Sequence, residues 1–182
     1  MKKKNIKGFT LIELMLVVLI IGILSGVMLG ILNIRGIQSK SKDAKRVGDL
    51  KKLQTALELY FADYRGYPKQ LAWGNVTGGV GSLLSPNYIN KVPTDPKEGV
   101  TAVDSGGASV TCFNGKSTYG YYYITTDCSG SGCILSGKYV LGAIVEVSSS
   151  AKDDLCSSLT NCNGAITCNC GGSYCYGVEN PL

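Results

Sequence analysis

Hydrophobic positions change their spacing along the chain, first filling a continuous run and then repeating every three or four residues. The run covers residues 9–32, and its polar members are Thr10, Glu13 and Ser25. Beyond it, one helix face would carry Val47, Leu50, Leu53, Leu57, Phe61 and Tyr64. Gly66 and Pro68 then end the pattern. The sequence therefore predicts a long helix over residues 9–64, apolar all round at first and amphipathic afterwards.

The rest of the chain, residues 65–182, has the pattern of loops and short strands. Residues 73–82 are rich in glycine and residues 91–96 contain two prolines, so both segments are predicted to be loops. Aromatic and β-branched residues predict two strong strands at 119–125 and 138–147, and two weaker ones at 110–113 and 174–178. Alternate residues of the second strand would face one side: Tyr139, Leu141, Ala143, Val145 and Val147. We expect an α+β fold, in which the amphipathic half of the helix packs against a small antiparallel sheet.

The apolar run is long enough to cross a membrane. A helix over residues 9–32 would rise about 36 Å, against about 30 Å of hydrocarbon in a bilayer. The lysines before it favour a cytoplasmic N-terminus: Lys2, Lys3, Lys4 and Lys7. Basic residues from Arg35 to Arg46 also lie on the C-terminal side of the apolar run, however. Charge alone therefore leaves the orientation open.

Cysteine usage decides the orientation, because all eight cysteines lie in the region 112–175. They are Cys112, Cys128, Cys133, Cys156, Cys162, Cys168, Cys170 and Cys175. An even number of cysteines in a Gly/Ser-rich segment predicts disulfides, which persist outside the reducing cytosol. We therefore expect the C-terminal part outside the cytosol and the N-terminus inside it. On a strand, Cys168 and Cys170 would point the same way, so we expect them to have different partners. The remaining pairing stays open, and zinc bound by four cysteines is the weaker alternative.

Composition argues against an enzyme. The chain contains no histidine, which removes the commonest general base and a frequent zinc ligand. It also has no phosphate-binding loop, so we expect no catalytic residue, cofactor or metal. The formal charge of +5 comes mostly from the first eight residues and does not indicate a nucleic-acid partner. Base stacking on DNA stays open as the weaker alternative to core packing for Tyr119, Tyr121, Tyr122 and Tyr123.

The segment from Gly8 to Glu13, Gly-Phe-Thr-Leu-Ile-Glu, stands directly behind the lysines and opens the apolar run. Here the chain resembles the type IV pilin and type II secretion pseudopilin family, whose leaders are short, basic and end in glycine. The resemblance implies that a prepilin peptidase removes residues 1–8. It implies cleavage between Gly8 and Phe9, followed by methylation of the new amine to give N-methylphenylalanine.

Glu13 needs a partner, because a carboxylate in hydrocarbon costs about 2.5 to 3.5 kcal/mol on insertion scales. The resemblance implies that the partner is the Phe9 amine of an adjacent subunit in the assembled filament. A carboxylate that is protonated or reaches the membrane surface is the alternative. Gly22, Gly26 and Gly30 recur every four residues, a spacing that lets membrane helices pack closely. Glycines that are merely tolerated there are an equal alternative.

Two later segments extend the resemblance to about residue 99. Residues 65–68 (Arg-Gly-Tyr-Pro) and 92–96 (Val-Pro-Thr-Asp-Pro) resemble the segments after the long helix of major pseudopilins. Lys97-Glu98 departs from that pattern, since Trp-Gly is frequent at this place.

The resemblance implies a structural subunit of a type IV pilus or a pseudopilus. Such a subunit is inserted as a single-pass membrane protein with a cytoplasmic N-terminus. A cytoplasmic assembly ATPase and an inner-membrane platform complex then polymerise it with copies of itself, giving a filament in the periplasm or at the cell surface. The alternative is a minor pilin or DNA-uptake or adhesion subunit whose head binds DNA or a surface. A membrane-anchored enzyme is a third class, which the composition disfavours.

Overall fold

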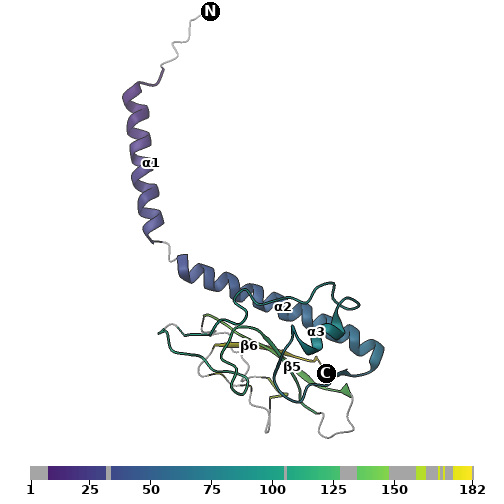
Figure 1. Ribbon diagram of the computed structural model, residues 1–182. Coiled ribbons are helices and arrows are strands. Elements are labelled where there is room, and N and C mark those ends of the chain that lie inside the picture. Colours follow the sequence, from purple (N-terminus) through teal and green to yellow (C-terminus); the bar gives the residue numbers. More distant parts are fainter. Residues whose placement is uncertain are drawn as a thin grey trace, which may run out of the picture. The chain divides into compact units, whose positions relative to one another are not determined.

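The computed structural model describes residues 8–31, 34–104, 106–127, 135–147, 159–162, 168, 170 and 174–181, without the side chains of residues 28–31, 34 and 35. The chain divides into two compact units, Met1–Ile37 and Gln38–Leu182. The long helix predicted over residues 9–64 is described as α1 (Leu11–Ile31) and α2 (Ile34–Tyr64), drawn in Figure 1. Residues 32–33 between them lie outside the described residues.

The first unit contains α1, whose described side chains are apolar except for Glu13 and Ser25 and are open to solvent in the single chain. Phe9 is 89 % exposed, Leu11 is 80 % exposed, and the described hydrophobic side chains as far as Val27 are likewise exposed. Within the ranges that the structure describes, no helix combines the length and the hydropathy that crossing a membrane requires.

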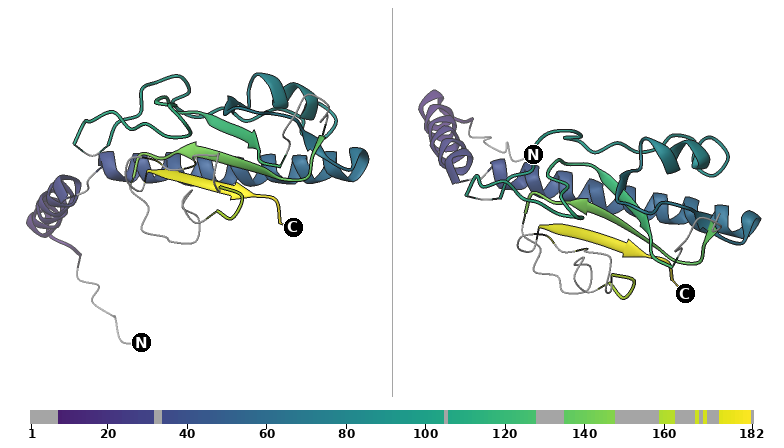
Figure 2. Two further views of the ribbon diagram at one scale, coloured as in Figure 1. Left: turned by 90° about the horizontal axis from the view of Figure 1, so that it is seen from below. Right: turned by 60° about the horizontal axis from the view of Figure 1, so that its bottom comes forward.

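The second unit is an α+β head, which confirms the predicted fold class. Its main sheet has the antiparallel order β2-β3-β5-β6, and a small second sheet pairs β1 with β4. The strands are β1 (Tyr67–Pro68), β2 (Gly74–Asn75), β3 (Tyr121–Thr125), β4 (Leu135–Ser136), β5 (Tyr139–Ile144) and β6 (Cys175–Glu179). In the two views of Figure 2, α2 runs along one side of this sheet.

The near face of the sheet packs against α2. The side chains of Leu50, Leu53 and Leu57 are fully buried and form one cluster with residues of β3, β5 and β6. The predicted alternation is present at Tyr139, Leu141, Ala143 and Val145, which belong to the cluster. Val147 was wrongly predicted to join them, because β5 ends at Ile144. Tyr64 was wrongly predicted to share this face. It is 54 % exposed, and its ring stacks on Tyr60 with the centroids 4.4 Å apart.

The far face of the sheet carries a second hydrophobic cluster, to which the cysteine-rich region contributes. Its buried members include Trp73, Phe113 and Ile144 together with Cys112, Cys168 and Cys175. Because both faces are covered, every residue of β3 and β5 is buried. Gly142 in β5 is required here, since a Cβ at this position would overlap the Phe113 ring.

Three strand predictions correspond to β3, β5 and β6, but the prediction at residues 110–113 is wrong. Among the described residues, Cys112 makes only isolated bridges, to Lys116 and to Cys170. Phe113, Asn114 and Gly115 all have positive φ and form a tight turn instead. The glycine-rich segment 73–82, predicted to be a loop, contains β2 and the start of α3 (Gly79–Leu84).

Candidate functional site

The predicted leader junction lies ahead of α1. Gly8, Phe9 and Thr10 precede the helix, and all three are exposed. The leader residues before Gly8, including Lys2 to Lys7, lie outside the described residues. On the described side of the junction, no packed structure covers the peptide bond between Gly8 and Phe9. A hydrolytic enzyme could therefore approach this bond without unfolding any described element.

Thr10 and Glu13 cap the first turn of α1. The Glu13 carboxylate accepts hydrogen bonds from the backbone N–H and the hydroxyl of Thr10, each at 2.8 Å. In return, the Glu13 backbone N–H donates to the Thr10 hydroxyl oxygen at 3.3 Å. This is a capping box, in which two side chains satisfy the first free N–H groups of a helix. This capping box was not predicted, although a threonine three residues before a glutamate is its sequence signature.

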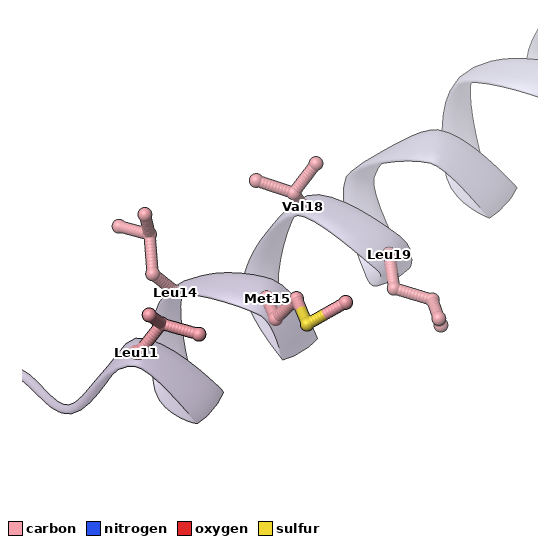
Figure 3. Close-up of a pocket in the computed structure, with 5 residues that line it drawn as sticks. All are labelled: Leu11, Leu14, Met15, Val18 and Leu19. Carbon is pink, nitrogen blue, oxygen red and sulfur yellow. The ribbon is translucent and has the colours of Figure 1, made fainter.

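A continuous apolar stripe follows along one side of α1. Figure 3 shows its five side chains, Leu11, Leu14, Met15, Val18 and Leu19. Their spacing of three or four residues places them on one helix face. Gly22 and Gly26 extend that face, and a Cβ built at either glycine meets no atom within 4 Å. The surroundings of Gly30 lie outside the description. The stripe offers bulky side chains followed by a flat segment, which suits contact with lipid or with another helix.

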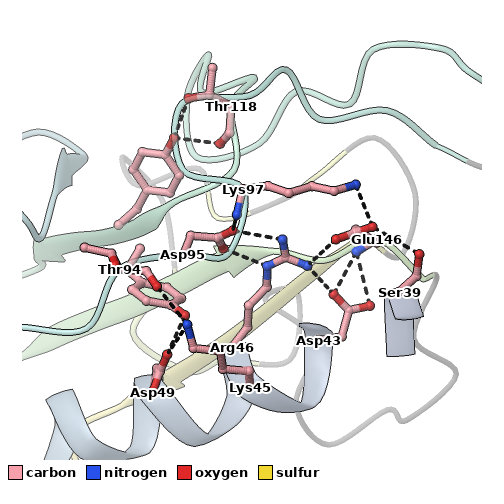
Figure 4. Close-up of polar contacts among 12 residues, drawn as sticks. Ser39, Asp43, Lys45, Arg46, Asp49, Thr94, Asp95, Lys97, Thr118 and Glu146 are labelled. Atoms are coloured by element: carbon pink, nitrogen blue, oxygen red, sulfur yellow. Dashed lines mark hydrogen bonds and ion pairs between the residues drawn. The ribbon is translucent and has the colours of Figure 1, made fainter. Parts of the chain in front are cut away.

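In the head, the Arg46 side chain has no exposed surface and is bonded to three carboxylates (Figure 4). Its guanidinium donates to both Asp95 carboxylate oxygens, at 2.6 and 2.9 Å. It also donates to Asp43 at 2.6 Å and to Glu146 at 3.2 Å. The three carboxylates come from α2, from the loop at residues 92–97 and from the turn that follows β5, so Arg46 connects three separate segments.

Three further residues contact this group of charges. Lys97 Nζ lies 2.8 Å from Glu146, and Ser39 donates to the other side of the same carboxylate oxygen at 3.0 Å. The Tyr119 ring lies beneath both cations, 4.6 Å from the Arg46 guanidinium carbon and 5.3 Å from Lys97 Nζ. We call Arg46, Asp43, Asp95, Lys97 and Glu146 the Arg46 cluster. It has the properties of a structural clamp, since its charges are paired and largely buried.

Two acidic residues of α2 are engaged with strands of the head. Asp49 is buried and accepts a hydrogen bond from the Tyr121 hydroxyl at 2.9 Å. Glu58 accepts from the hydroxyls of Tyr67 and Tyr139, at 2.8 and 2.9 Å. Tyrosines of the sheet thus donate to carboxylates of α2, which satisfies both groups away from water.

Arg46 and Glu146 keep their charges in spite of burial. Burial disfavours the charged guanidinium, but hydrogen bonds and charge interactions with Asp95 and Asp43 outweigh it and raise the pKa of Arg46. Burial likewise disfavours the Glu146 carboxylate, yet Lys97, Ser39 and Arg46 together lower its pKa. The charged forms of Arg46 and Glu146 are therefore favoured at neutral pH.

Acidification should weaken the head through Glu146. Because the folded-state pKa lies below the ordinary value of 4.5, the stabilisation is complete above that value and is lost as the pH falls through the folded-state pKa. Glu146→Gln should lower the free energy of unfolding at neutral pH by about 1 to 3 kcal/mol. It should also flatten the decline below about pH 5. Thermal unfolding across this pH range measures both. The exposed control Asp63→Asn should keep the wild-type profile, and an unchanged profile in Glu146→Gln would contradict the assignment.

The tyrosines considered for DNA stacking are core residues. Tyr119, Tyr121, Tyr122 and Tyr123 are between 0 and 3 % exposed. Tyr123 donates its hydroxyl to the Pro68 carbonyl at 2.8 Å, within the same core. Their rings have no free face for a base, so the stacking alternative is wrong for these four residues.

The described cysteines are all in disulfides. Cys112 is bonded to Cys170 and Cys162 to Cys168, so Cys168 and Cys170 have different partners, as expected. Cys175 is also disulfide-bonded. None of these five is therefore a thiolate ligand for zinc. Cys128, Cys133 and Cys156 lie outside the described residues.

Comparison with known proteins bears on the N-terminal half. A family model described as the prokaryotic N-terminal methylation motif matches residues 3–29. A type II secretion system core protein G from Pseudomonas aeruginosa is 36 % identical over 103 residues, covering 53 % of this chain and 71 % of the relative. The proteins of the same name from Aeromonas hydrophila and Escherichia coli K12 are 30 % and 31 % identical, covering 71 % and 66 % of their lengths. No solved structure gives a significant match.

Proposed function

Because this chain belongs to the type II secretion system core protein G family, we propose that it is the structural subunit of a secretion pseudopilus. The exposed apolar helix α1, directly behind the Gly8–Phe9 junction, is the observation that supports this proposal most strongly. A helix that is apolar all round has no stable place in water. It needs a bilayer before assembly and the helices of other subunits afterwards.

The proposal assigns each region of the chain a task. Residues 1–8 hold the N-terminus in the cytoplasm until a prepilin peptidase removes them, and α1 anchors the subunit in the inner membrane. A cytoplasmic ATPase and a membrane platform then transfer α1 from lipid into the filament core. The head, Gln38–Leu182, forms the outer surface. Disulfide formation requires this head to lie outside the cytosol.

The subunit acts mechanically and not as a catalyst. Its paired charges are used in the Arg46 cluster and in the contacts of α2 with the sheet. The described cysteines are oxidised to disulfides and offer no thiolate nucleophile. The free energy for filament growth would therefore come from the assembly ATPase.

The mature subunit should begin at Phe9 and carry one methyl group on its amine. Intact-mass measurement and sequencing of the N-terminal peptide, on protein purified from native filaments, test this directly. A Gly8→Leu variant should remain uncleaved, because it alters the residue on the leader side of the junction. The same variant should give no filaments while still entering the membrane. Assembled wild-type protein that retains Lys2 to Lys7 would contradict the proposal.

A further inference from the structure

Three cations follow the apolar segment before any acidic residue occurs. They are Arg35, Lys40 and Lys42, which we call the basic collar. From Leu14 to Lys42 the sequence contains no aspartate or glutamate. The collar therefore has no acidic neighbour on its N-terminal side, and its charge is concentrated where the chain leaves α1.

The two described lysines of the collar have no partner within the described part of the molecule. Lys40 is exposed and Lys42 is half-buried, and neither forms a hydrogen bond or ion pair there. Three of the next four cations along α2 are engaged. Lys45 donates to the Thr94 carbonyl, Arg46 is enclosed by carboxylates, and Lys52 pairs with Asp49. The fourth, Lys51, is exposed but lies further from the apolar segment than the collar.

The distribution of the collar around α2 indicates what kind of partner it fits. At 100° per residue, positions 35 and 42 lie on one side of a helix, whereas position 40 projects more than a third of a turn away. A protein groove would contact one side of the helix only. A layer of lipid headgroups surrounds a helix at a given depth and can reach every side.

The distance along the chain agrees with that partner. Within α2, Lys40 and Lys42 lie about 9 and 12 Å along the helix axis from its first residue, Ile34. Headgroups occupy several ångströms beyond the hydrocarbon, and lysine side chains can extend back toward them. Lys51 and Lys52 lie more than a Debye length further along α2.

We propose that the basic collar binds the anionic phospholipid headgroups of the outer leaflet while the subunit waits in the membrane. This inference rests on the membrane anchoring in the proposed function. Each cation near an anionic surface strengthens association about fivefold, an effect that salt weakens. The collar would thereby hold the start of α2 at the membrane surface until the assembly machinery withdraws the helix.

The test uses the full-length chain in nanodiscs of phosphatidylcholine, alone or mixed with phosphatidylglycerol. Amide hydrogen exchange of residues 38–45 should be several-fold slower in the mixed discs at low salt, and the difference should vanish at high salt. Lys40→Gln with Lys42→Gln should remove the lipid dependence. The matched control, Lys51→Gln with Lys52→Gln on the same helix, should keep it.

Equal exchange rates in the two lipids would overturn the proposal. So would slowing that persists in the Lys40→Gln, Lys42→Gln variant. If amide exchange slows with the number of protein copies per disc and not with lipid charge, the collar contacts a neighbouring subunit, which also contradicts the proposal. Filament yield separates this inference from the proposed function. Normal filaments with lipid-independent exchange contradict the collar alone, whereas absent filaments with lipid-dependent exchange contradict the filament role alone.

Discussion

Arg46→Met should lower the free energy of unfolding of the head by about 3 to 5 kcal/mol. Methionine has a similar reach but no charge, so Asp95, Asp43 and Glu146 would keep their positions without the guanidinium between them. The side chains of Arg46 and Asp95 are completely buried, so water cannot replace the lost partner without disrupting the packing. Thermal unfolding of the full chain in detergent should show a decrease in Tm of about 10 °C.

A matched control and a second substitution separate charge from packing. Lys51→Met changes an exposed lysine of the same helix and should leave Tm nearly unchanged. Adding Asp95→Asn to Arg46→Met should recover part of the loss, because it removes one of the uncompensated charges. A loss below about 1 kcal/mol in Arg46→Met would show that the cluster contributes little, as exposed ion pairs do.

Glu13→Leu should abolish or strongly reduce filaments while leaving membrane insertion intact. Leucine enters hydrocarbon more readily than glutamate, so insertion should not suffer. The head should fold normally, because Glu13 lies in the other compact unit. Cleavage after Gly8 should also persist, whereas methylation would fall if the methylating enzyme reads the same carboxylate. Cell fractionation and imaging of sheared filaments measure the outcome.

The capping box supplies the control for the Glu13 experiment. Glu13→Gln keeps an oxygen that can accept the Thr10 hydrogen bonds, but it removes the negative charge. If the charge pairs with the Phe9 amine of a neighbour, both variants should lose filaments. If capping is the only role, Glu13→Gln should assemble and Glu13→Leu should not. Normal filaments from both variants would mean that the carboxylate is not needed for assembly.

Periodic features of the head could be predicted because they depend on near neighbours in the sequence. The spacing of Leu50, Leu53 and Leu57 gave the buried face of α2, and alternation gave the buried face of β5. The strand prediction at residues 110–113 was wrong because it relied on a valine and a phenylalanine. Asn114 and Gly115 form a turn there, which places the Phe113 ring in the far-face cluster.

The polar contacts were harder to predict because the donor and acceptor residues lie far apart in the sequence. Arg46 is four residues before Leu50 and so shares its buried face, which was a usable signal. Its partner Asp95, however, is 49 residues away and Glu146 is 100 residues away. Charged residues on a helix usually indicate a solvated surface, and only the tertiary fold brings Tyr121 to Asp49. The capping box at Thr10 and Glu13, by contrast, was a local motif.

The placement of Arg46 also determines how the head would respond to tension. A load carried along α2 reaches the head through Ser39, Asp43 and Arg46 in turn. The Arg46 guanidinium is bonded to carboxylates on the loop at residues 92–97 and in the turn that follows β5. Leu50, Leu53 and Leu57 follow directly along the same helix and are fully buried. Pulling along the helix axis would therefore shear several charged contacts and a packed face at once, instead of peeling them apart one by one. Resistance to force depends on the unfolding rate, so this cluster would set how long a subunit withstands a stretched filament.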